Sequence, residues 1–116
     1  MTASTPPLPP GSTVGIIGGG QLGRMLASAA ARLGLRTAVV DPDPECPAAQ
    51  VANVMVRGAY DDPAALAELA RISDVITYEF ENVPVAPLRR LAAIRPVHPP
   101  VEALEVSQDR VTEKAF

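Results

Sequence analysis

The feature that most constrains this chain is a glycine-rich turn between an apolar run and an amphipathic segment. Residues 13–18 form a short apolar run that ends in glycine, which predicts a buried β-strand. A G-x-G-x-x-G pattern follows at Gly18, Gly20 and Gly23. Glycines let the backbone turn sharply, and the free N–H groups at the start of the next helix attract anions. The pattern therefore predicts a strand, a tight turn and a helix that opens toward a phosphate.

The segment after the turn carries apolar residues at helical spacing. They recur at i, i+3, i+4, i+7, i+8 and i+11, and they are Leu22, Met25, Leu26, Ala29, Ala30 and Leu33. This periodicity predicts a helix from Gln21 to about Leu33 that buries this apolar face, with Gly34 just past its end. A glycine-rich turn that binds no ligand is the alternative.

Strand and helix patterns alternate along the rest of the chain. Further strands are predicted at 35–41, 53–56, 74–78 and 96–98. One further helix begins after Asp62, which suits the N-cap, with Pro63 at the first helical position. Other helices are predicted at 84–93, at 101–106 and from Ser107 onward. This alternation predicts an α/β fold, a doubly wound parallel sheet of the Rossmann-like type. Ligands of such sheets bind beyond the carboxyl ends of the strands.

Composition excludes several classes of function. The ten Lys and Arg residues are scattered in a chain of 116 residues with net charge −3, and aromatic residues make up 3% without Trp, which argues against a nucleic-acid partner. The sequence has neither a signal-peptide pattern nor an apolar stretch that could span a bilayer. Cys46 is the single cysteine and His98 the single histidine. We therefore expect a cytoplasmic protein with no membrane partner, no disulfide and no metal site.

Polar residues follow two of the predicted strands. Asp41 ends the second strand at about the spacing where dinucleotide-binding domains carry a ribose-binding acid. Glu79, Glu81 and Asn82 follow the fourth strand, and two carboxylates match a pyrophosphate poorly. They suit a monophosphate ligand with amino or ring N–H donors at its other end. Solvated surface acids are the alternative for each glutamate.

Four motifs resemble the N-terminal domain of the 5-(carboxyamino)imidazole ribonucleotide synthase family, which belongs to the ATP-grasp superfamily. They occupy 18–25, 41–44, 78–84 and 107–114, and read GGGQLGRM, DPDP, YEFENVP and SQDR followed by EK. The resemblance runs from about Thr13 to Phe116. The last two motifs are more specific than the glycine turn, which other members of the superfamily share.

The resemblance implies an ATP-dependent ligase of de novo purine biosynthesis. Such an enzyme joins bicarbonate to 5-aminoimidazole ribonucleotide through carboxyphosphate, with magnesium accompanying ATP, and releases ADP and phosphate. By family match, the substrate-binding residues are Gly20, Gln21, Leu22, Glu79, Glu81 and Asn82. Arg110 matches a position that contacts ATP, and the family suggests a homodimer.

The resemblance also sets the expected domain organisation. Residues 1–12, with four prolines, are predicted to be a disordered leader, 13–106 the substrate-binding domain, and 107–116 the start of a connection to an ATP-grasp domain. No catalytic residue or metal ligand is expected within the chain, which should be inactive alone. An NAD-binding regulatory or oxidoreductase domain is the second hypothesis, based on the glycine turn and Asp41. A non-catalytic scaffold is the third, and the roles of Arg24 and Asp43 stay open.

Overall fold

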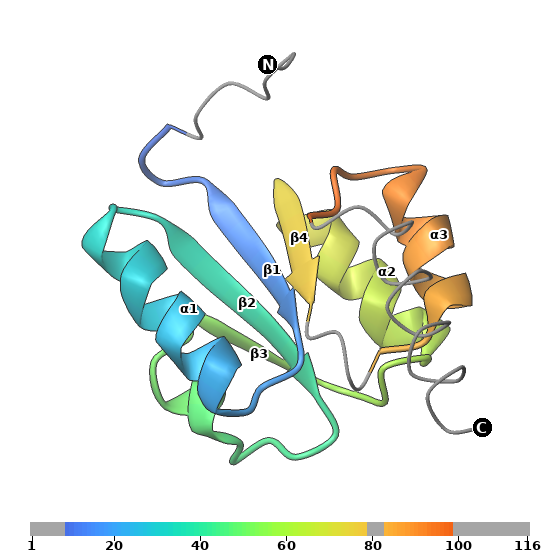
Figure 1. The fold of residues 1–116 in the computed structure, drawn as a ribbon, viewed down its shortest axis with the longest axis horizontal. Coiled ribbons are helices and arrows are strands. Elements are labelled where there is room, and N and C mark those ends of the chain that lie inside the picture. Colours follow the sequence, from blue (N-terminus) through green and yellow to red (C-terminus); the bar gives the residue numbers. More distant parts are fainter. Residues whose placement is uncertain (1–8, 79–82, 99–116) are drawn as a thin grey trace, which may run out of the picture.

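Four parallel strands form the centre of the computed structural model, which describes residues 9–78 and 83–98 (Figure 1). They are β1 (Thr13–Ile17), β2 (Arg36–Asp41), β3 (Val54–Arg57) and β4 (Val75–Tyr78), in the order β3-β2-β1-β4. The chain steps outward from β1 to β3 and then crosses back to place β4 on the other side of β1. The strand order thus reverses beside β1, which is where ligands bind in doubly wound sheets. The predicted α/β fold is confirmed.

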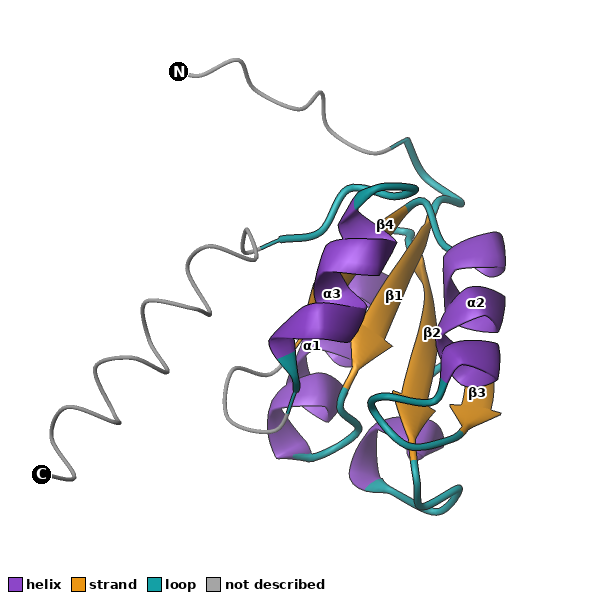
Figure 2. Cartoon of the chain, turned by 90° about the vertical axis from the view of Figure 1, so that its right-hand side faces the viewer, coloured by secondary structure: helices purple, strands orange, loops and turns teal. Residues whose placement is uncertain are grey.

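Helices cover both faces of the sheet. α1 (Gln21–Arg32) and the short 3-10 helix η1 (Pro47–Gln50) contact one face, and α2 (Pro63–Ile72) packs on the other together with α3 (Val85–Ala92). Figure 2 shows α1 and α2 on opposite sides of β1 and β2. Within the described residues, each helix is too short or too polar to cross a lipid bilayer.

The ends of α1 and α2 follow the predicted capping residues. Asp62 precedes α2, and its carboxylate accepts a hydrogen bond from the Ala64 N–H at 2.9 Å, while Pro63 opens the helix. Gly34 follows α1 with φ +78°, a conformation that side chains disfavour. Its N–H and that of Leu35 bond back to the last turn of α1, which closes the helix in a Schellman motif.

The two faces of the sheet are packed with side chains of different size. On the face of α2 and α3, the buried cluster contains large apolar residues, among them Ile17, Val40, Leu66, Leu69, Ile76, Tyr78, Leu88 and Leu91. On the face of α1 and η1, the cluster is smaller and consists of Ile16, Ala27, Val39, Cys46 and Ala48. The inward positions predicted for Leu88 and Leu91 are confirmed.

The predicted apolar face of α1 is wrong except at Ala30. The helix buries Gly23, Ala27 and Ala30, whereas Leu22, Met25 and Leu33 are 52%, 67% and 72% exposed. A side chain on Gly23 would overlap the carbonyl oxygen of Gly18, so the helix lies too close to the turn for anything larger. Periodicity weighs large apolar residues most, but at this distance the small residues make the contact.

One further prediction differs from the structure near the end of the chain, and others there are not tested. The predicted strand at 96–98 is a single parallel bridge between Val97 and Ile76, and the predicted helices at 101–106 and from Ser107 lie outside the described residues. Residues 9–12 fall in the predicted leader. There the Gly11 N–H donates to the Gly34 carbonyl at 2.8 Å. The domain boundaries stay predictions.

Candidate functional site

Directly after β1, the chain enters the glycine turn with a backbone conformation that only glycine adopts readily. Gly18 has φ +112°, and its N–H donates to the Val40 carbonyl at 3.0 Å. A side chain on Gly19 would overlap the Sγ atom of Cys46. The turn therefore depends on glycine at position 18 for its backbone conformation, and it packs closely against the loop that follows β2.

The turn delivers an uncapped helix N-terminus to the carboxyl edge of the sheet. Gly20 is the N-cap of α1, and among the described residues no side chain bonds to this end of the helix. The Arg24 N–H is the one that bonds back to Gly20, at 3.0 Å, so the N–H groups of the three residues before it have no partner within the helix. No acidic residue lies in the first turn of α1. The arrangement favours an anion, because these N–H groups and the helix dipole carry partial positive charge.

Asp41 lies behind the turn at the end of β2 and is 8% exposed. Its Oδ2 atom accepts from the Gly19 N–H at 2.8 Å and from the Tyr60 hydroxyl at 2.7 Å. Its Oδ1 atom accepts from the Asp43 N–H at 2.9 Å. A carboxylate has about four acceptor positions, and three are filled within the protein. The acid that the NAD hypothesis needs for a ribose is therefore committed to internal donors.

Cys46 packs beneath the glycine turn and is buried. Burial raises the pKa of its thiol, and the nearby carboxylates of Asp41 and Asp43 raise it further. A buried thiol that keeps its proton is a poor nucleophile. The prediction of a small structural residue here, rather than a catalytic one, agrees with this environment.

The predicted substrate-binding residues divide into two groups. Gly20, Gln21 and Leu22 lie together at the N-terminus of α1. The others, with the predicted ATP contact, lie outside the described residues and are Glu79, Glu81, Asn82 and Arg110. β4 ends at Tyr78, which pairs with Ile17 directly before the glycine turn. The described part of β4 therefore ends beside the turn.

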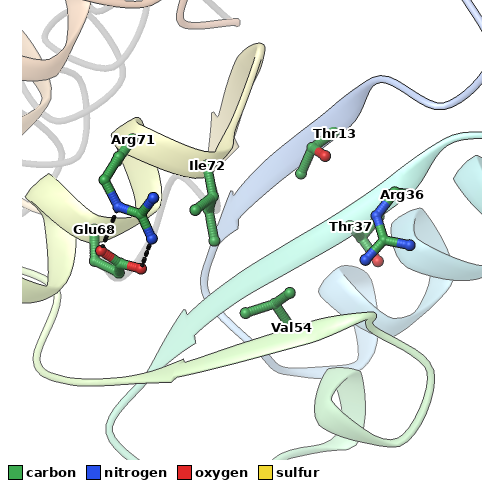
Figure 3. A pocket seen from close by; sticks show the side chains of 7 residues that line it. All are labelled: Thr13, Arg36, Thr37, Val54, Glu68, Arg71 and Ile72. Atoms are coloured by element: carbon green, nitrogen blue, oxygen red, sulfur yellow. Dashed lines mark hydrogen bonds and ion pairs between the residues drawn. The ribbon is translucent and has the colours of Figure 1, made fainter.

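A hollow lies at the opposite, amino end of the strands (Figure 3). Its volume is about 510 Å³, and it is lined by Thr13, Arg36, Thr37, Val54, Glu68, Arg71 and Ile72. The Arg71 guanidinium donates to Glu68, which lowers the pKa of that carboxyl and raises that of the arginine. Because doubly wound sheets bind ligands at the carboxyl ends of their strands, we assign the site to the glycine turn. Among the described residues, no three His, Cys, Asp or Glu side chains gather as a metal site.

A family model for the ribonucleotide synthetase preATP-grasp domain matches residues 12–108. The chain belongs to this family. Relatives of this preATP-grasp domain include the N5-carboxyaminoimidazole ribonucleotide synthase of Brucella melitensis, 67% identical over 109 residues that make up 94% of this chain and 30% of the relative. The synthase of Staphylococcus saprophyticus is 49% identical over 104 residues, or 90% and 28% of the two chains. This chain thus spans about 30% of the length of the relatives it matches.

Solved structures agree with this family assignment. The N5-carboxyaminoimidazole synthetase of Staphylococcus aureus, complexed with ADP, superimposes with a TM-score of 0.85 at 44% identity, over 93% of this chain and 30% of that one. The Aspergillus clavatus enzyme, in complex with ADP and 5-aminoimidazole ribonucleotide, gives a TM-score of 0.73 at 36% identity, over 82% and 26%. This chain therefore shares its preATP-grasp fold with the N-terminal part of longer enzymes whose structures contain bound ligands.

Sequence reasoning missed Tyr60, which contacts Asp41 from the loop after β3. Nothing in its local pattern marks it, because it is a lone aromatic residue before the capping pair Asp62 and Pro63. Its partner is 19 residues away in sequence. Only the parallel pairing of β2 and β3 brings the two loops together.

Proposed function

We propose that this chain is the substrate-binding N-terminal part of an ATP-dependent ligase. The ligase joins bicarbonate to 5-aminoimidazole ribonucleotide and forms 5-(carboxyamino)imidazole ribonucleotide, ADP and phosphate. The observation that carries the proposal is the uncapped N-terminus of α1, which opens at the carboxyl edge of the sheet in a chain of this family. The names of the relatives, and the ribonucleotide bound by the Aspergillus clavatus enzyme, support it.

The proposed substrate matches the site in charge. Its single phosphate accepts hydrogen bonds from the N–H groups of Gln21 and Leu22. These groups lie beside the N-cap Gly20, at the positive end of the helix dipole. Its exocyclic amine donates to Glu79, with Glu81 and Asn82 beside it, as the resemblance implies. A charge-assisted hydrogen bond to the amine orients the nitrogen that attacks the activated carboxyl group.

The remaining parts of the proposal rest on the resemblance. Arg110 contacts ATP, and residues 107–116 begin the connection to an ATP-grasp domain that binds magnesium and most of the nucleotide. The chain alone is then inactive, and the complete enzyme works as a homodimer in the cytoplasm. An arginine suits a phosphate contact because its charge is permanent and its donors are fixed in a plane.

A hybrid enzyme tests the proposal. The chain replaces the matching N-terminal segment of the Brucella melitensis relative, and ADP formation is measured with 5-aminoimidazole ribonucleotide and bicarbonate. We expect the hybrid to be active, and Glu79→Ala to raise the KM for the ribonucleotide about tenfold or more while the KM for ATP stays unchanged. A lost charge-assisted hydrogen bond costs about 1.5–3 kcal/mol, which corresponds to this change.

Glu68→Ala is the matched control, because this glutamate is exposed on α2 and lies at the amino end of the strands. It should leave both KM values unchanged. If Glu79→Ala and Glu68→Ala behave alike, the assignment of Glu79 is wrong. Titration of the isolated chain with the ribonucleotide provides a second test, since the amide NMR signals of 20–22 should shift first; no shift at any concentration would contradict the phosphate site.

A further inference from the structure

Asp41 connects three loops at the carboxyl edge of the sheet. Its carboxylate accepts from the Gly19 N–H after β1, the Asp43 N–H after β2 and the Tyr60 hydroxyl after β3. We call these four groups the carboxylate clamp. The backbone of Asp41 adds a fourth connection, because its carbonyl accepts from the Gly58 N–H at 3.1 Å. No step of the proposed reaction uses this clamp.

The clamp holds one side of Gly19, and η1 holds the other. The Gly19 carbonyl accepts from the Ala48 N–H at 2.9 Å, and Cys46 packs against its α-carbon. Both peptide groups of Gly19 are therefore fixed by the loop after β2. Because Gly20 is the next residue and the N-cap of α1, this fixes the direction in which the following N–H groups point.

The charge of Asp41 opposes the proposed ligand, whereas its position favours it. A carboxylate hydrogen-bonded to the glycine turn repels a phosphate at the end of the same turn. Removing the charge should strengthen phosphate binding if electrostatics decides. It should weaken binding if the hydrogen bonds of the clamp decide. The two effects have opposite signs and can be separated by experiment.

Resting on the proposed function, we propose that Asp41 and Tyr60 are positioning residues that hold the glycine turn in the conformation that receives the ribonucleotide phosphate. Neither touches the substrate. Asp41 supplies the acceptor for Gly19, and the Tyr60 hydroxyl holds the same oxygen atom in place. In dinucleotide-binding domains an acid at this position binds a ribose. In this chain Asp41 instead supports the phosphate site by holding the glycine turn.

Three variants of the hybrid enzyme test this role. Asp41→Asn keeps the shape of the side chain but replaces one acceptor atom with a donor, so either Gly19 or Asp43 loses its acceptor. Tyr60→Phe removes only the hydroxyl. We expect the KM for the ribonucleotide to rise about tenfold for Asp41→Asn and about threefold for Tyr60→Phe, with the KM for ATP unchanged in both.

Asp43→Asn is the matched control. It removes the charge of a carboxylate two residues away, keeps an Oδ1 atom to accept from the Glu45 N–H, and leaves the backbone N–H of residue 43, which belongs to the clamp, unchanged. This control should leave the KM for the ribonucleotide unchanged or slightly lower it. If Asp41→Asn lowers that KM as well, the carboxylate acts through its charge and the proposal is wrong.

Hydrogen exchange of the Gly19 amide in the isolated chain provides a readout that needs no substrate. Exchange at this amide should become faster in Tyr60→Phe relative to amides in the centre of β1, whereas general destabilisation would accelerate both. A wild-type hybrid that forms no ADP with the ribonucleotide would contradict the proposed function. A wild-type hybrid that uses it, with KM values unchanged in Asp41→Asn and Tyr60→Phe, would overturn only the positioning role.

Discussion

The two faces of the sheet are built on different principles. On the face of α2 and α3, leucines, isoleucines and Tyr78 pack together, whereas on the other face α1 and η1 place glycine, alanine and cysteine against Ile16 and Val39. Large side chains remove more apolar surface from water and so contribute more to stability. Small ones bring backbones close together, which fixes positions. The site lies on the side that is poor in apolar area and rich in close backbone contacts.

This contrast explains why α1 exposes its large apolar residues. Leu22, Met25 and Leu33 point away from the sheet because Gly23 and Ala27 allow the helix to approach the turn. A helix held by larger residues would lie farther from Gly18 and Gly19. We therefore expect the α2 face to contribute most of the stability and the α1 face to set the geometry of the glycine turn.

The largest expected effect is a loss of stability on the α2 face. Leu69 is fully buried in the large cluster, and Leu69→Ala should lower the free energy of unfolding by about 2–5 kcal/mol. Urea unfolding followed by circular dichroism measures it. Leu33→Ala makes the same change at the exposed C-cap residue that follows α1 and should cost less than about 0.5 kcal/mol. Equal losses at the two positions would remove the contrast.

An intermediate effect is expected from overpacking on the α1 face. Ala27 is 1% exposed between α1 and the sheet, and Ala27→Leu should cost about 1–3 kcal/mol. Because the added side chain pushes α1 outward, the amide NMR signals of residues 19–22 should move as well. Ala29→Leu, on the exposed side of the same helix, should change neither. A change in stability without movement of the turn would show that α1 does not set its geometry.

The smallest expected effect concerns the pH dependence of stability. Burial raises the pKa of the Cys46 thiol in the folded chain above its unfolded value of about 8.5. The folded state therefore favours the protonated thiol, and this contribution is complete below pH of about 8.5 and is lost as the pH rises through the folded-state pKa. Unfolding midpoints of the wild type should fall more steeply above that pH than those of Cys46→Ala. Parallel curves would contradict a buried, neutral thiol.

The sequence predicts the order of the elements well because their boundaries carry local signals. Asp62 with Pro63 and the single residue Gly34 fix where helices begin and end, and no distant contact is needed to recognise them. The glycine turn is equally local. These features depend on backbone conformations that only a few residue types satisfy.

What the sequence could not predict depends on distances between elements. The buried face of α1 follows from how closely the helix approaches Gly18, and periodicity contains no such information. The role of Asp41 follows from Tyr60 and Gly19, which lie 19 and 22 residues away along the chain. A spacing rule places an acid at the end of β2, but it cannot say whether other groups already occupy its oxygen atoms.

The strand order also has a consequence for how the chain folds. The clamp and the glycine turn involve only residues up to Tyr60, which lies in the loop between β3 and α2. β4 pairs with β1 across 61 residues, as between Val14 and Val75, and closing so long a loop slows the formation of that pair. We expect β1, β2 and β3, with the glycine turn proposed to bind phosphate, to assemble early during synthesis, and β4 to dock onto a turn that is already formed.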